Sequence, residues 1–106
     1  MVKLIRTRTV TNDGPLFPLR IDDPDDVLGR YVDLVSEQRG FAGLSRTSVG
    51  KSFLMVIVLD NIADARALYR LLTDRSIPAV DDYENLIAAT AASARTQYET
   101  TWRLMP

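Results

Sequence analysis

The sequence contains no histidine and no cysteine among its 106 residues. Without cysteine, the chain cannot form disulfides, ligate zinc or iron–sulfur clusters through thiolates, or use a thiol nucleophile. Without histidine, it lacks the commonest general base, the Ser-His-Asp triad, and the imidazole ligand of haem and of nearly every catalytic zinc site. Any chemistry must therefore use other side chains, and we expect neither a metal nor another cofactor.

The sequence also has no large excess of positive or negative charge and no long apolar run. The formal net charge is −1, so the sequence lacks the basic excess typical of nucleic-acid-binding domains, and we expect no nucleic-acid partner. The longest apolar run, Phe53 to Leu59, is far shorter than the roughly 20 residues that span a bilayer, so we expect no membrane partner either. Charges at Lys3 and Arg6 interrupt the N-terminal segment where a signal peptide would be apolar, which favours a cytoplasmic protein.

Four segments have the composition of strands within one expected domain over residues 1–106. They are rich in β-branched or apolar residues and are bounded by turn signals. The predicted strands are Val2–Thr11, Phe41–Val49, Ser52–Asp60 and Gln97–Met105. An irregular connector, Leu16–Ile21, is expected after the first strand.

Three helices are predicted between these strands. The first should begin at the N-cap Asp23, with Pro24 in the first helical position, and should end before Gly40. A second, capped by Asp60 or Asn61, should run through Leu72, and a third should run from Asp81 or Asp82 to about Arg95. The apolar faces at helical spacing are Val27, Leu28, Tyr31, Leu34 and Val35 in the first helix, Ala65, Leu68, Tyr69 and Leu72 in the second, and Tyr83, Leu86, Ile87, Thr90 and Ala94 in the third.

The resulting order is β-α-β-β-α-α-β, which predicts a ferredoxin-like α+β fold with an antiparallel four-stranded sheet and helices on one face. The Ser52–Asp60 strand is apolar on both sides, so it should be central and covered on both faces. Because the helices cover only one face, a second copy of the chain is the simplest cover for the other, and we expect a homodimer.

Three segments carry a resemblance to a known family: Gly40-Phe41-Ala42-Gly43-Leu44, the run Phe53 to Asp60, and Ala63 to Leu68. They resemble the dimeric α+β barrel superfamily, and within it the antibiotic biosynthesis monooxygenase family. The resemblance implies a homodimer and a cofactor-independent oxygenation of a small aromatic or polyketide-like substrate. It also implies a role for Asn12, whose amide would donate a hydrogen bond to a developing oxyanion.

The sequence departs from that family at two functional positions. Members often carry a tryptophan just after the third strand, where this chain has Asp60-Asn61, and Trp102 on the last strand is no positional match. Haem-degrading members use a histidine, so we do not expect that activity in a chain without one. These departures leave open the alternative of a non-catalytic small-molecule-binding or dimerisation module.

Two arginines on the first strand are the most informative polar residues. Alternation places Arg6 and Arg8 on one face of a central strand, where an unpaired charge would be costly. They indicate either an anion or phenolate site, which Arg46 could join, or a structural ion-pair cluster in which Glu99 on the neighbouring strand is one partner.

Two aromatic side chains are candidates for the wall of such a pocket. Tyr98 and Trp102 share a face of the last strand and could contact a substrate, although their place on an apolar stripe favours core packing.

Two further motifs favour ordinary structural explanations. The segment Ser45–Ser52 ends like a phosphate-binding loop, but it lacks the first glycine and leads into a strand instead of a helix. The acidic run Asp22–Asp26 could suggest a metal, but its spacing is not that of a calcium loop and helix capping accounts for it.

Overall fold

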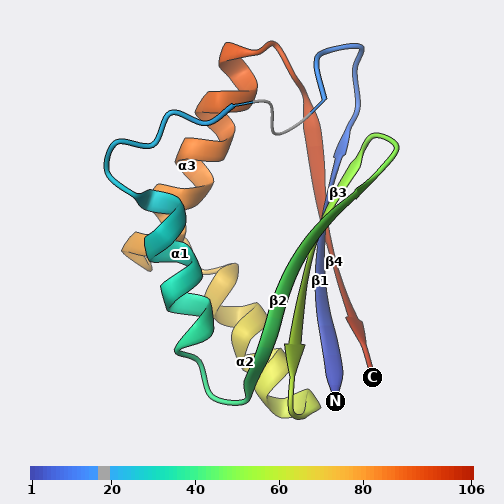
Figure 1. Cartoon of the computed structure of the whole chain (residues 1–106), viewed down its shortest axis with the longest axis vertical. Helices are drawn as coiled ribbons and strands as arrows, with labels where there is room; N and C mark the ends of the chain where they lie inside the picture. The colour runs from blue at the N-terminus through green and yellow to red at the C-terminus, as the bar shows by residue number, and fades with distance from the viewer. Residues whose placement is uncertain (17–19) are drawn as a thin grey trace.

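The computed structural model describes residues 1–16 and 20–106, and these residues form one sheet covered on one side by helices. The strands are β1 (Val2–Val10), β2 (Phe41–Val49), β3 (Ser52–Leu59) and β4 (Tyr98–Met105). The helices are α1 (Val27–Ser36), α2 (Ile62–Leu72) and α3 (Pro78–Ser93). Figure 1 shows all three helices on the same side of the sheet, which confirms the predicted α+β ferredoxin-like architecture.

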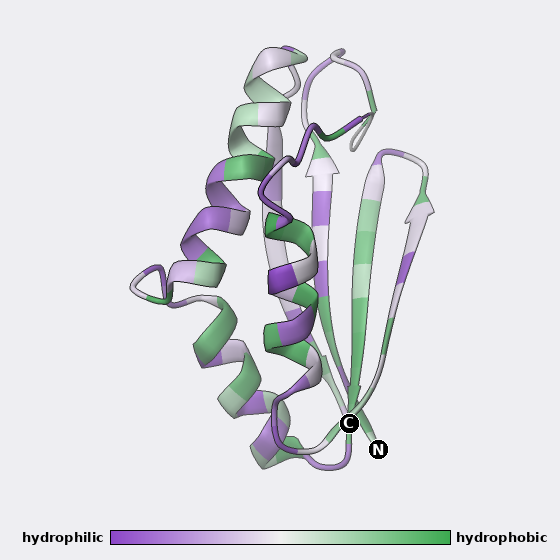
Figure 2. Ribbon diagram, turned by 60° about the vertical axis from the view of Figure 1, so that its left-hand side comes forward, coloured by the Kyte–Doolittle hydropathy of each residue, from purple (hydrophilic) through white to green (hydrophobic). Residues whose placement is uncertain are grey.

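The sheet has the order β2-β3-β1-β4, and its three pairings are all antiparallel. The apolar strand β3 therefore lies next to β1 in the centre, as predicted. Figure 2 shows hydrophobic colour along β3, and both hydrophobic and hydrophilic bands along β1 and along the helices. The core lies between these two layers and includes Leu4, Ile57, Leu59, Leu68 and Val80, which are at most 2% exposed.

The register places each arginine of β1 in a row of residues that crosses the helix-covered face of the sheet. Residues opposite one another on neighbouring strands point to the same face. One row runs Trp102, Arg6, Met55 and Arg46 across β4, β1, β3 and β2, and the next runs Thr100, Arg8, Phe53 and Ser48. Both arginines of β1 therefore point toward the helices.

The first helix starts later than the sequence predicts. A turn joins the Asp26 N–H to the Asp23 carbonyl at 3.3 Å, and Asp26 has a φ of 52°, so Pro24 precedes the helix. The Asp23 carboxylate nevertheless accepts hydrogen bonds from the first helical N–H groups, those of Val27 at 2.7 Å and Leu28 at 2.9 Å. Of the acidic run, Asp23 thus has a capping role, at a helix start displaced to Val27, whereas the Asp26 side chain makes no capping hydrogen bond.

The third helix starts earlier than predicted, at Pro78 instead of Asp81 or Asp82. Proline is favoured in the first helical turn, because its missing N–H would have no partner there. The Ile77-Pro78 step therefore begins α3, whereas α2 ends at Leu72 as predicted and is capped by Asn61, which accepts from the Asp64 N–H at 2.9 Å.

Two remaining predictions concern regions around the fold. The expected connector Leu16–Ile21 includes residues 17–19, which lie outside the described residues. None of the helices in the described ranges is long and apolar enough to cross a bilayer.

Candidate functional site

A cavity of about 310 Å³ lies between the helix-covered face of the sheet and α3. Arg6, Arg8, Arg46 and Tyr83 supply charged or hydroxyl groups to its lining. Its apolar lining includes Ile21, Leu28, Phe53, Met55 and Ile87. The volume is in the range of pockets that hold small organic molecules, and a mostly apolar wall with a few polar groups is typical of such pockets.

Arg6 is the most unusual residue of this cavity. It is 6% exposed, and its guanidinium donates to two neutral groups, the Tyr83 hydroxyl at 2.8 Å and the Tyr31 hydroxyl at 3.3 Å. Within the described ranges no carboxylate lies within ion-pairing distance, and the buried Nε has no hydrogen-bond partner. A buried cation without a counter-ion is expensive, so the site has an unmet preference for an anion.

The two tyrosines bound to Arg6 form a stacked pair joining α1 and α3. The ring centroids of Tyr31 and Tyr83 are 3.7 Å apart with an angle of 12° between the planes, and the Arg6 guanidinium lies 5.2 Å from the Tyr83 ring centroid. Burial raises the pKa of Tyr31 although the nearby Arg6 charge opposes the rise, so this phenol stays neutral. The pair holds Arg6 by hydrogen bonds and ring contacts without neutralising it.

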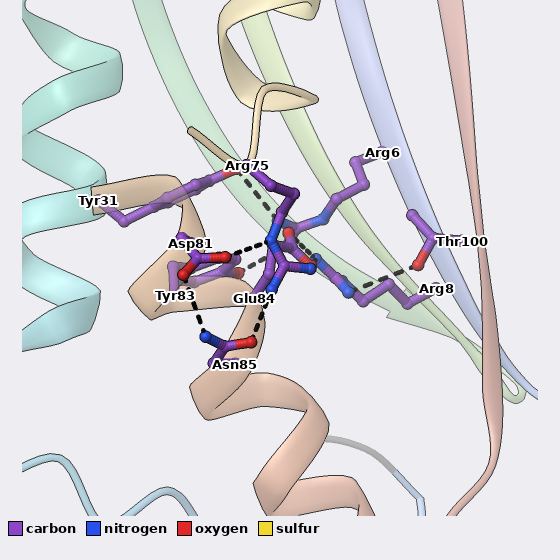
Figure 3. Close-up of polar contacts among 9 residues, drawn as sticks. All are labelled: Arg6, Arg8, Tyr31, Arg75, Asp81, Tyr83, Glu84, Asn85 and Thr100. Carbon is purple, nitrogen blue, oxygen red and sulfur yellow. Dashed lines mark hydrogen bonds and ion pairs between the residues drawn. The ribbon is translucent and has the colours of Figure 1, made fainter. Parts of the chain in front are cut away.

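Arg8 has a counter-ion, and it is not the one predicted. Its NH2 group donates to both carboxylate oxygens of Glu84 on α3, at 2.6 and 2.8 Å, and its NH1 group donates to Thr100 at 3.4 Å (Figure 3). Burial lowers the pKa of Arg8, but the hydrogen bond and charge of Glu84 outweigh it, so that the net shift is upward. The expectation of Glu99 as partner is wrong, because Thr100, not Glu99, lies opposite Arg8 and Glu99 therefore points to the other face.

The structure brings three of the predicted site residues together and separates the others. Arg6, Arg8 and Arg46 line the same cavity, with Arg46 exposed. Tyr98 lies beside this group, since the Arg8 guanidinium is 5.5 Å from its ring centroid, but it does not line the cavity. Trp102 packs edge-on against Tyr69 of α2, at 5.6 Å between centroids, and lines a separate hollow of about 220 Å³.

Asn12 occupies a turn beyond the end of β1. Its side-chain oxygen accepts from the backbone N–H groups of Gly14 and Gln97, each at 3.1 Å, and its NH2 group donates to the Arg95 carbonyl at 2.9 Å. It does not line the cavity, and backbone groups occupy its amide. We therefore assign Asn12 to the β1–α3–β4 corner of the fold and leave it out of the site.

The Ser45–Ser52 segment forms the β2–β3 hairpin, with residues Gly50 and Lys51 at the turn, so no helix N-terminus follows it. This agrees with the structural explanation that the sequence favoured. In the described ranges, no cluster of three or more acidic residues is arranged to hold a metal ion.

Sequence reasoning missed three residues of the site: Tyr31, Tyr83 and Glu84. The tyrosines fall on apolar helical stripes, and core packing explains that position without a polar role. The usable signal was the pair of arginines on a central strand, because each needs partners from the helix layer above it. What the sequence could not supply was the rotation of α3 that turns Tyr83 and Glu84 toward those arginines.

The fold and this site define a class of small α+β proteins with a pocket between sheet and helices. Among solved structures, the chain is similar to SnoaB, a cofactor-independent oxygenase from Streptomyces nogalater, with a TM-score of 0.56 and 15% identity over 99% of this chain and 90% of that one. A structure described as an antibiotic biosynthesis monooxygenase matches with a TM-score of 0.51 and 15% identity, over 100% of this chain and 97% of that one. An uncharacterised NIPSNAP domain protein from Burkholderia xenovorans matches with a TM-score of 0.50 and 15% identity, over 100% and 93%.

No protein-family model and no curated protein sequence matches the chain. The similarity is therefore one of fold. The chain has the fold of the antibiotic biosynthesis monooxygenase-like proteins, as its sequence pattern suggests.

Proposed function

We propose that the chain is a cofactor-independent oxygenase-type enzyme, and that its cavity binds a small aromatic substrate as a phenolate or enolate. The observation that carries this proposal is the buried Arg6, which lines the cavity with neutral partners only. An ionised oxygen entering the cavity would supply the missing negative charge, and the Phe53 ring would offer an aromatic surface to the rest of the ligand.

Arg8 fits the same proposal in a different way. Its charge is balanced by Glu84, so the two contribute no net charge, and Arg6 sets the preference for one negative charge. The exposed Arg46 adds a second cation that would attract an anion to the cavity. The lining therefore favours an anion with an aromatic body over a neutral ligand.

Ionisation is also the step that such chemistry needs. A phenolate or enolate is electron-rich and can itself reduce molecular oxygen, so the substrate supplies the electrons. In a substrate with a methylene group conjugated to the ionised ring, that carbon is oxidised to a carbonyl. One atom of the oxygen molecule enters the product, and the other leaves as water with the two methylene hydrogens. The fold similarity to a cofactor-independent oxygenase supports this class of reaction.

Oxygen uptake tests the proposal. Wild-type protein should consume oxygen with polycyclic phenols that carry such a methylene group, in the presence of a chelator. Arg6→Met should lower kcat/KM by about tenfold to a hundredfold, the usual effect of losing a hydrogen bond to a charged group. The matched control is Arg70→Met, at an exposed position of α2 outside the cavity, which should leave uptake unchanged.

A second function is favoured by one observation. The described lining of the cavity contains no carboxylate, and the chain has no histidine, so the pocket holds no ordinary general base. A non-catalytic module that binds aromatic anions has the same lining. Binding of phenols without oxygen uptake, across a series that includes readily oxidised ones, would identify this second function and overturn the first.

We also infer that a second copy covers the open face of the sheet. Leu54, Val56 and Val58 of β3 and Ile5 of β1 point to that face, opposite the helices. Val56→Glu would place a charge at its centre and should convert a dimer into a monomer in light scattering. A wild-type protein that is monomeric at all concentrations would contradict the inference.

A further inference from the structure

We propose that Tyr83 donates its hydroxyl hydrogen to the ionised oxygen of the ligand and so acts as the oxyanion donor of the cavity. The inference rests on the proposed function and deepens it by naming the side chain that donates a hydrogen bond to the anion. Asn12, the donor that the sequence suggested, is held in a turn by three backbone groups and does not line the cavity. Another donor is therefore needed.

The hydrogen-bond inventory of Tyr83 leaves its own hydrogen unused. A phenol can accept and donate, whereas a guanidinium only donates. The contact of 2.8 Å between Arg6 and Tyr83 must therefore run from the guanidinium to the phenol oxygen. In the part of the chain that the structure describes, the Tyr83 hydroxyl has no second hydrogen-bond partner.

Arg6 also makes Tyr83 a stronger donor. A hydroxyl whose oxygen accepts a hydrogen bond from a cation is polarised, so its hydrogen binds an anion more tightly. The Arg8 guanidinium lies 5.9 Å from the same ring centroid and adds to the positive field (Figure 3). Arg6 then acts on the ligand both by its charge and through the Tyr83 hydroxyl.

Tyr31 provides an internal comparison. It also accepts from Arg6, at 3.3 Å, and stacks on Tyr83, but it is 1% exposed and does not line the cavity. A purely structural role in holding Arg6 would belong to both tyrosines. A role in contacting the ligand belongs to Tyr83 alone.

The test uses para-nitrophenol, whose phenolate is coloured and is not oxidised by oxygen, so the result is independent of any oxygenase activity. Wild-type protein should bind the phenolate and lower the pH at which the probe ionises. Tyr83→Phe should weaken phenolate binding about tenfold. It should also raise the pH at which half of the bound probe is ionised by about one unit. Tyr31→Phe should change binding by less than about threefold, because it removes no contact to the ligand.

Thermal melts verify that both variants fold. Should Tyr83→Phe not fold, NMR of the wild-type protein answers the same question. The label is placed on the tyrosine ring carbon that bears the oxygen. Addition of the probe should then shift the Tyr83 signal more than any other tyrosine signal. Equal weakening in both variants, unchanged binding in Tyr83→Phe, or no phenolate binding by the wild type would overturn the inference. Phenolate binding that depends on Tyr83 without any oxygen uptake would support it while overturning the oxygenase proposal.

Discussion

The guanidinium of Arg8 on β1 and the carboxylate of Glu84 on α3 meet at 2.6 and 2.8 Å across the space between sheet and helix. The side chains are 3% and 18% exposed, so water screens the pair little. Glu84→Gln should lower the free energy of unfolding by about 3 kcal/mol, because it leaves the Arg8 charge buried without its counter-ion. Urea titration measures this loss. A double variant, Arg8→Met with Glu84→Gln, should lose much less than the sum of the two single changes.

Replacing each of the two arginines of β1 should lower the free energy of unfolding by a different amount. Arg8→Met leaves the Glu84 carboxylate without its cation, whereas Arg6→Met leaves only the two tyrosine hydroxyls without a donor. We expect Arg8→Met to be more destabilising than Arg6→Met by about 2 kcal/mol, measured by urea unfolding without ligand. Equal losses would show that Arg6 has a counter-charge in the folded protein.

Much of the fold could be predicted because strand alternation and helical spacing are local. The alternation along Val2 to Val10 correctly placed Arg6 and Arg8 on one face, and the uninterrupted apolar run of β3 correctly indicated a central strand. Errors arose at helix starts. The positive φ of Asp26 is not encoded by any local pattern, whereas Pro78 follows the local preference for proline in a first helical turn and was interpreted as a helix breaker instead.

The candidate site was predictable only in part, because its partners come from distant segments. Glu84 is 76 positions from Arg8 in the sequence, and no local pattern marks it as the partner of Arg8. Glu99 lies on the strand next to Arg8, but its side chain points to the opposite face of the sheet. Trp102 lies opposite Arg6 in the sheet and so on the arginine face, yet its position in β4 directs it toward Tyr69 of α2 instead of the cavity. Choosing among such residues needs the rotation and position of each helix over the sheet.

Asn12→Ala separates a structural role from a catalytic one. The change removes the acceptor for the Gly14 and Gln97 N–H groups and the donor to the Arg95 carbonyl. We expect a loss of about 1–3 kcal/mol in the free energy of unfolding, the range for leaving such groups unpaired. Phenolate affinity of the folded variant, measured at a temperature well below its melting point, should equal that of the wild type. A large drop in affinity with unchanged stability would return Asn12 to the site.

Gly40 and Gly43 offer a matched pair of substitutions around the start of β2. Gly40 has a φ of +78°, and an added Cβ would meet the Asp64 carboxylate, whose carbon lies 2.8 Å away. Gly40→Ala should therefore cost about 1–2 kcal/mol from backbone strain alone, with the collision adding to it. Within one copy of the chain nothing lies within 4 Å of a Cβ at Gly43, so Gly43→Ala should be much less destabilising than Gly40→Ala. Thermal melts compare the two, and equal effects would contradict the assigned geometry.

Tyr31 should make the protein sensitive to alkaline pH. Burial holds the pKa of this phenol above its ordinary value, so the folded protein keeps the proton at a pH where the unfolded chain releases it. The contribution to stability is full below about pH 10, the ordinary pKa of tyrosine, and is lost as the pH rises toward the folded value. The free energy of unfolding should therefore fall by up to about 1.4 kcal/mol per pH unit above that point.

Tyr31→Phe should be less stable than the wild type at neutral pH, because Arg6 loses an acceptor, but its stability should fall less steeply between about pH 10 and 11. Urea titrations at several alkaline pH values measure the two slopes, and identical slopes would show that Tyr31 does not carry the effect.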